Sequence, residues 1–220
     1  MYKLIHKDIK LLVNYFVIAV PVSIFFVITF TLVYPGFGYA MGAFGIAAML
    51  VLIIPSIEAK NHTEIIINSL PVLRSEIILT KYLATFVYTA IGLLLVALTG
   101  ILINFGIPSY HLPYLNWQNV VITLISVSLL VSIYYPLFYR FNNQVVILFL
   151  NVIVFQLIFF MPSFVNDYIN EHINETLVQQ LLQLNMHTPW ALPLLGTTIA
   201  LMLLIISYLF TVKIYTAKDF

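Results

Sequence analysis

The sequence contains no cysteine and few charged residues, and both shortages narrow the class of protein. Without cysteine there is no disulfide framework, no thiolate nucleophile and no cysteine metal site. Only 8% of the 220 residues are charged. Soluble domains carry about a quarter, so the composition excludes a water-soluble fold. The net charge of +1 is sorted by position and forms no basic patch, so nucleic acid is not an expected partner.

Signals for chemistry are also missing. No glycine-rich phosphate loop is present, so the chain cannot bind ATP by that route, and energy for uphill transport would come from another polypeptide. The five histidines are scattered, and no nucleophile–base–acid set is visible, which disfavours an enzyme. Asp167, Glu171 and Glu175 are spread along about three helical turns and would not converge on one metal ion.

Apolar residues make up 62% of the chain and form runs long enough to cross a hydrocarbon core of about 30 Å. We therefore predict an all-α polytopic membrane protein with a single transmembrane domain over residues 1–220. The six predicted spans cover about residues 11–33, 39–57, 83–105, 119–139, 145–161 and 190–212. The second span opens with Gly38, Gly42 and Gly45, a small-residue face that suits a partner or, as we favour, a neighbouring helix of the same chain.

Two amphipathic segments lie outside these spans. Residues 1–10 set apolar positions against Lys3, Lys7 and Lys10, which predicts a short helix on the membrane surface. A frayed basic lead-in to the first span is the alternative. Residues 164–188 repeat apolar side chains at every fourth position, with the three carboxylates named above on the opposite face. This pattern predicts a second surface helix between the fifth and sixth spans.

The basic residues indicate how the chain is oriented. With six spans, the segments 1–10, 58–82, 140–144 and 213–220 share one side of the membrane and hold all nine Lys and Arg. The segments on the other side hold none. Because basic residues favour the cytoplasmic side, we predict that both termini are cytoplasmic.

No Asp, Glu, Lys, Arg or His falls inside a predicted span, which disfavours an ion-coupled transporter. Four polar side chains at membrane depth could line a transport pathway: Asn14, Asn104, Asn151 and Gln156. Such amides more often form hydrogen bonds between helices.

The segment 58–82, EAKNHTEIIINSLPVLRSEIILTKY, is the most strongly patterned part of the chain outside the spans. Asn61, with Glu64 three positions later, fits a variant of the capping box that begins a helix. Pro71 should end that helix at or before Leu70.

A second helix then begins near Ser75 and Glu76 and meets the membrane near Lys81. We interpret the segment as a short helix below the membrane that a partner can bind. The alternative is a self-contained re-entrant hairpin whose isoleucines dip into lipid.

The same segment resembles the "E…KN…E…SLP-V-x-R-x-E-I-V-x-x-K-Y" pattern of bacterial ABC-2 type transporter permeases. The matching residues are Glu58, Lys60, Asn61, Glu64, Ser69, Leu70, Pro71, Val72, Arg74, Glu76, Ile77, Lys81 and Tyr82. The six-span layout also matches, and within the family the chain is most similar to small permeases of Gram-positive bacteria, such as those of the staphylococcal phenol-soluble modulin exporter. One departure is Leu73, where the family often has the Ser or Thr of a capping box.

The resemblance implies a permease subunit of an ATP-driven exporter in the bacterial plasma membrane. Two permease subunits, identical or paralogous, would assemble with cytosolic ABC ATPases that bind ATP and Mg, so this chain would hold no cofactor. The loop would carry the coupling helix that docks on the ATPase. The implied coupling residues are Glu58, Lys60, Asn61, Glu64, Leu70, Pro71, Arg74, Glu76 and Lys81.

The uncharged spans favour an amphipathic or hydrophobic cargo, such as a peptide, a drug or a lipid-like molecule. A second hypothesis is an accessory or immunity protein of the lipid bilayer that sequesters a peptide without pumping it. Such a protein would need no ATPase.

Overall fold

The computed structural model describes residues 20–31, 37–61, 72–106, 112, 114–141 and 187–217, together with isolated residues between 146 and 180. All the regular elements in these ranges are helices. Four are long and apolar enough to cross a membrane: α2 (Gly38–Lys60), α4 (Arg74–Gly106), α5 (Trp117–Arg140) and α8 (Ala191–Thr216). A shorter apolar helix covers Val20–Thr31.

These helices fall where the second, third, fourth and sixth spans are predicted, and Val20–Thr31 lies inside the first. Helix α4 begins at Arg74, close to the helix start predicted near Ser75 and Glu76, and continues without a break into the predicted third span. The carbonyl of Leu73 accepts hydrogen bonds from the backbone N–H groups of Glu76 (2.9 Å) and Ile77 (3.2 Å). The Leu73 side chain has no polar atom, so the first turn is held by these backbone hydrogen bonds and not by a side-chain cap from Leu73. With 33 residues, α4 is about 50 Å long and extends beyond a hydrocarbon core.

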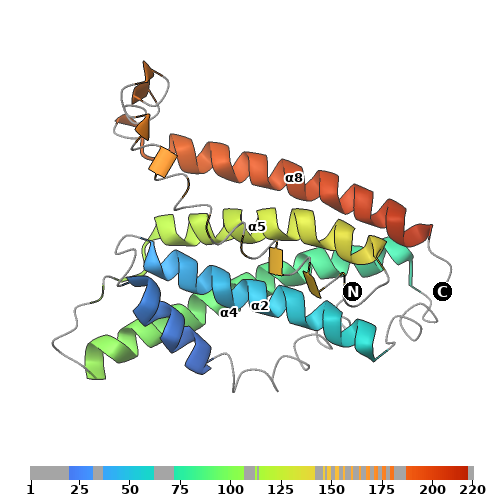
Figure 1. The fold of residues 1–220 in the computed structure, drawn as a ribbon, viewed down its shortest axis with the longest axis horizontal. Coiled ribbons are helices and arrows are strands. Elements are labelled where there is room, and N and C mark those ends of the chain that lie inside the picture. The colour runs from blue at the N-terminus through green and yellow to red at the C-terminus, as the bar shows by residue number, and fades with distance from the viewer. Residues whose placement is uncertain are drawn as a thin grey trace.

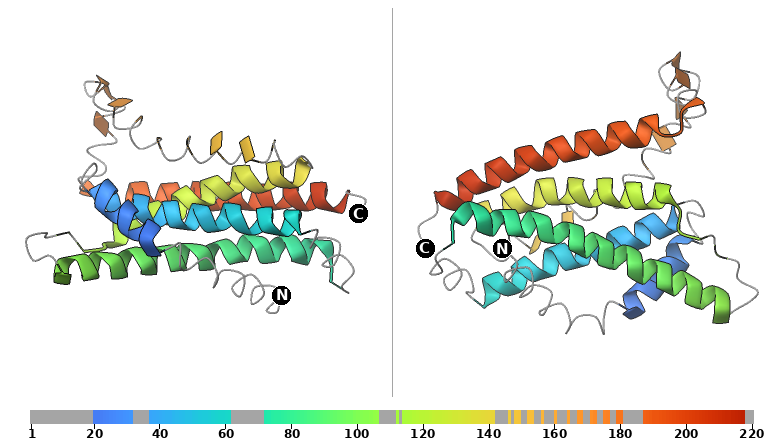
Figure 2. Two further views of the ribbon diagram at one scale, coloured as in Figure 1. Left: turned by 60° about the horizontal axis from the view of Figure 1, so that its bottom comes forward. Right: turned by 180° about the vertical axis from the view of Figure 1, so that it is seen from behind.

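The four long helices lie side by side: α2, α5 and α8 run in one direction and α4 runs in the opposite one, so that α2, α5 and α8 end where α4 begins (Figures 1 and 2). We call this end of the bundle the loop end, because the chain leaves α2 there and returns in α4. The opposite end is called the far end. Helices α4 and α5 contact each other and both remaining helices.

Helix α2 is the most buried of the four long helices. Its apolar window is 72% buried, compared with 17% for α8. The glycines at its start face the Val20–Thr31 helix: a Cβ at Gly42 would lie 3.7 Å from Phe26, and one at Gly45 would meet the Phe26 ring. The prediction that this glycine face packs against a helix of the same chain is therefore confirmed. On another side, Gly92 of α4 lies so close to α2 that a Cβ would be 2.8 Å from the Ala43 carbonyl.

Charged and aromatic side chains mark the two ends of the bundle. The Asp, Glu, Lys and Arg residues of the four long helices all lie toward the loop end: Glu58, Lys60, Arg74, Glu76, Lys81, Arg140 and Lys213. At the far end, the exposed Trp117 and Trp190 begin α5 and α8, with ring centroids 6.3 Å apart. This segregation agrees with the charge pattern used for the predicted orientation, and the assignment of the loop end to the cytoplasm stays a prediction.

Several predictions fall outside the described residues. These are the surface helix at residues 1–10, the loop helix between Asn61 and Pro71, and most of the span at 145–161 and of the amphipathic segment 164–188. The count of six spans therefore stays a prediction.

Candidate functional site

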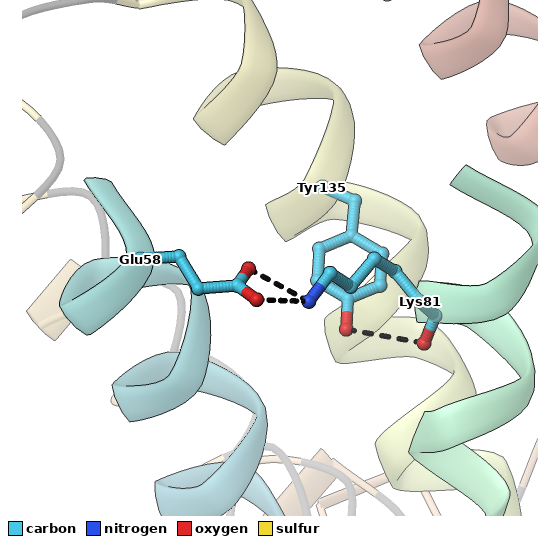
Figure 3. A network of polar contacts seen from close by, with 3 residues as sticks. All are labelled: Glu58, Lys81 and Tyr135. Atoms are coloured by element: carbon cyan, nitrogen blue, oxygen red, sulfur yellow. Dashed lines mark hydrogen bonds and ion pairs between the residues drawn. The ribbon is translucent and has the colours of Figure 1, made fainter. Parts of the chain in front are cut away.

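The two ends of the loop segment are tied together by an ion pair between Glu58, at the end of α2, and Lys81, on α4 (Figure 3). Lys81 Nζ lies 2.7 Å from both carboxylate oxygens of Glu58. Each side chain is only 7% exposed. Because charged groups are costly to remove from water unless they are paired, this geometry holds the last turn of α2 against α4.

A third helix supports this pair. The Tyr135 hydroxyl of α5 donates a hydrogen bond to the Lys81 carbonyl at 3.4 Å (Figure 3). The Tyr135 ring also meets the edge of the Tyr82 ring, with centroids 5.1 Å apart, an arrangement that aromatic pairs favour. The roots of the loop are thus buried among α2, α4 and α5.

Two further contacts join the first turn of α4 to the end of α8. The Arg74 guanidinium donates a hydrogen bond to the Thr216 carbonyl at 3.0 Å. Thr216 is the last residue of α8, and a cation there satisfies a terminal carbonyl and complements the helix dipole. The Tyr208 hydroxyl of α8 donates to the Ser75 carbonyl at 3.4 Å.

About two turns further along α4, the Tyr82 hydroxyl lies between two hydroxyls of α8. It is 2.7 Å from Ser207 Oγ and 2.9 Å from Thr211 Oγ1, and all three side chains are buried. Thr211 also donates to the Ser207 carbonyl at 2.8 Å. The Tyr82 ring meets the edge of the Tyr208 ring at 5.6 Å, so α4 and α8 share both polar and aromatic contacts at the loop end.

The remaining residues predicted for the loop have different surroundings. Glu76 is half-buried, whereas Asn61 and Leu73 are exposed, and Leu73 is 68% exposed. Lys60 is the last residue of α2. Glu64, Leu70 and Pro71 lie outside the described residues, as do Lys3, Lys7 and Lys10 of the predicted surface helix. Their roles stay predictions.

The candidate pathway amides do not converge in the described part of the chain. The Asn104 side chain forms two hydrogen bonds with the backbone of Leu112: its amide donates to the carbonyl at 3.0 Å, and its oxygen accepts from the N–H at 2.8 Å. This pairing ties the loop between α4 and α5 to the far end of α4. Gln156 is exposed, and Asn14 and Asn151 lie outside the described residues.

The sequence reasoning missed the α8 partners of the loop. Ser207 and Thr211 belong to the buried stripe of α8, which also contains Ala200, Leu204 and Tyr215. Two hydroxyl residues four positions apart on one face of an apolar span are a recognisable signal, because such groups commonly form hydrogen bonds between membrane helices. The sequence does not show which helix they face.

The residues at the loop end form hydrogen bonds, an ion pair and ring contacts between helices. Among the described residues, no group of three or more His, Asp or Glu side chains could hold a metal ion. The contacts at the loop end join the end of α2 and the start of α4 to α5 and α8. The long apolar helices and these contacts define a multi-pass helical membrane protein.

Comparison with known protein families identifies the family to which the chain belongs. The family model described as ABC-2 family transporter protein matches residues 3–216, and the chain therefore belongs to this family. The resemblance seen in segment 58–82 is thus confirmed at the level of the family. The protein is a membrane transport component and is not itself catalytic. Searches of curated proteins and of solved structures found no match.

Proposed function

We propose that the chain is the permease subunit of an ATP-driven exporter in the bacterial plasma membrane. A cytosolic ABC ATPase, which binds the ATP and Mg, docks on the segment 58–82, and a second permease subunit, identical or paralogous, completes the pathway. Membership of the ABC-2 family supports this proposal. The observation that carries the role of the loop is its anchoring: both of its roots are fixed to other helices by buried contacts.

A loop that transmits force needs rigid roots and an accessible surface. The ion pair between Glu58 and Lys81 supplies the rigid base, and its two charges bind each other rather than a partner. Leu73 supplies an exposed apolar side chain beside the half-buried carboxylate of Glu76. Interfaces gain much of their binding energy from a few apolar anchors surrounded by polar groups, and this pair has that composition.

The proposed cargo is amphipathic or hydrophobic, and the proposed direction is outward. The described helices carry no charged side chain between the loop end and the far end. Ion-coupled transport requires ionisable groups at membrane depth, so an apolar cargo moved by a partner ATPase suits these helices better.

The test is a tagged pull-down from native membranes in mild detergent, with the co-purifying proteins identified. We expect a stoichiometric ABC ATPase that is lost in Leu73→Glu and Glu76→Arg. The matched control is Arg140→Glu, which reverses an exposed charge at the same end of the bundle but outside the loop. An intact protein that purifies without any ATPase would contradict the proposal. Retention of the ATPase in both loop variants would contradict the docking site.

A further inference from the structure

We infer that α8 is driven by the loop through the Tyr82 hydroxyl, which makes the start of α4 and the end of α8 move as one unit. This inference rests on the proposed function, because it assigns a path to the force that the ATPase would apply. It concerns a positioning residue, since Tyr82 acts through Ser207 and Thr211 of α8.

Helix α8 is the helix that most needs such a link. Its apolar window is only 17% buried, so most of its length is apolar surface. In a bilayer this surface gains no hydrophobic free energy from facing one neighbour rather than another, because lipid tails are as apolar as the side chains. Close packing on α5 and hydrogen bonds to α4 must therefore fix the rotation of α8.

The directional contacts to α4 are concentrated in one region. They join residues 74–82 of α4 to residues 207–216 of α8: Arg74 to Thr216, Tyr208 to Ser75, and Tyr82 to Ser207 and Thr211. The Tyr82 contacts are the ones that are fully buried. Water does not compete for buried hydroxyls, so these contacts hold their geometry when the loop is displaced.

Support along the rest of α8 comes from α5. A Cβ at Gly196, near the start of α8, would lie 2.9 Å from Ile125 of α5. At the other end, the rings of Tyr215 and Tyr139 pack edge to face at 5.2 Å. Removing the Tyr82 hydroxyl therefore leaves α8 packed on α5 and changes only its connection to α4.

Tyr82 lies where α4 contacts the other three long helices. It follows Lys81, whose ammonium holds Glu58 of α2, and its own ring contacts Tyr135 of α5. A displacement of the loop reaches α2 through Lys81 and α8 through Tyr82. One turn of α4 thus distributes the movement to the other long helices.

The experiment uses the absence of native cysteine, which allows spin labels to be placed without background. Leu73→Cys and Lys213→Cys put labels on exposed positions of the loop root and of α8. The first readout is the distance distribution between the labels in the permease alone, by double electron–electron resonance. We expect a narrow distribution that broadens in Tyr82→Phe, which keeps the ring and loses the hydroxyl. An unchanged distribution in that variant would overturn the inference.

The second readout adds the partner ATPase. Labels at Arg140→Cys and Lys213→Cys report the position of α8 relative to α5, with and without ATP and Mg. We expect an ATP-dependent shift in the parent that is lost in Tyr82→Phe while ATP hydrolysis continues. A shift that persists in Tyr82→Phe, or no shift in the parent with the ATPase bound, would overturn the inference.

Two sets of controls complete the design. Ser207→Ala combined with Thr211→Val removes the partners of the hydroxyl and should reproduce the effect of Tyr82→Phe in both readouts. Tyr114→Phe removes the hydroxyl of an exposed tyrosine at the far end and should change neither. Failure of the proposed function appears separately, as an ATPase that does not bind, because the first readout needs no ATPase.

Discussion

Removing one partner of the buried ion pair between Glu58 and Lys81 should destabilise the fold strongly. Both carboxylate oxygens of Glu58 lie 2.7 Å from Lys81 Nζ, and both side chains are 7% exposed. In Glu58→Met the ammonium loses its counter-charge in a site with little water. Breaking a buried pair in this way costs about 3–5 kcal/mol, and we expect Glu58→Met and Lys81→Met each to lie in this range.

The double variant Glu58→Met/Lys81→Met separates the charge effect from the loss of packing. It removes both charges and replaces them with apolar side chains of similar length. Replacing a buried pair by apolar residues is often neutral, so we expect a loss below about 2 kcal/mol. The coupling free energy between the two sites should then be several kcal/mol, well above the value for independent sites.

The assay is reversible unfolding of the purified protein in mixed micelles, with the free energy of unfolding compared across all four proteins. Glu76→Gln is the matched control, because it removes a half-buried carboxylate of α4, the helix that carries Lys81. It should change the free energy of unfolding by less than about 1 kcal/mol. Losses that add up in the double variant would refute the reasoning. They would mean that each side chain contributes by packing and that the charges are solvated separately.

Two further predictions follow from close packing and from orientation. Gly92→Ala places a methyl group 2.8 Å from the Ala43 carbonyl and should reduce the free energy of unfolding by about 1–3 kcal/mol, which lowers the melting temperature. The control Gly106→Ala, with nothing within 4 Å, should change neither quantity. An unchanged melting temperature in Gly92→Ala would contradict the close approach of α2 and α4. In intact cells, a membrane-impermeant maleimide should label Tyr114→Cys at the far end and spare Leu73→Cys at the loop end. Labelling of Leu73→Cys but not of Tyr114→Cys would contradict the predicted orientation, in which the loop end is cytoplasmic.

The contacts at the loop end change how the predicted coupling residues are understood. Glu58 and Lys81 come from the charged segment, yet they lie inside the bundle and hold each other. Arg74 holds the end of α8. In the proposed docking role, these residues would support the docking surface from inside the bundle, and the exposed Leu73 and the half-buried Glu76 would contact the partner.

The sequence by itself determined four of the predicted spans and the segregation of charge among them. Apolar runs specify membrane helices because every backbone polar group must be satisfied within the segment, so α2, α4, α5 and α8 follow from composition and length. The same reasoning predicts the glycine face of α2, since Gly42 and Gly45 lie on one side of a helix and allow close packing. The pattern of segment 58–82 indicated the family.

Only the tertiary structure decided which side chains meet. Glu58 and Lys81 are separated by 23 residues and Tyr82 and Ser207 by 125, and no hydropathy pattern specifies either pair. Asn104 illustrates the same limit, because its amide binds the backbone of Leu112 rather than another helix. An apolar run fixes that a helix crosses the membrane, but its rotation and its neighbours depend on packing among helices that are all apolar. The polar contacts at the loop end specify which helices are neighbours there and which of their faces meet.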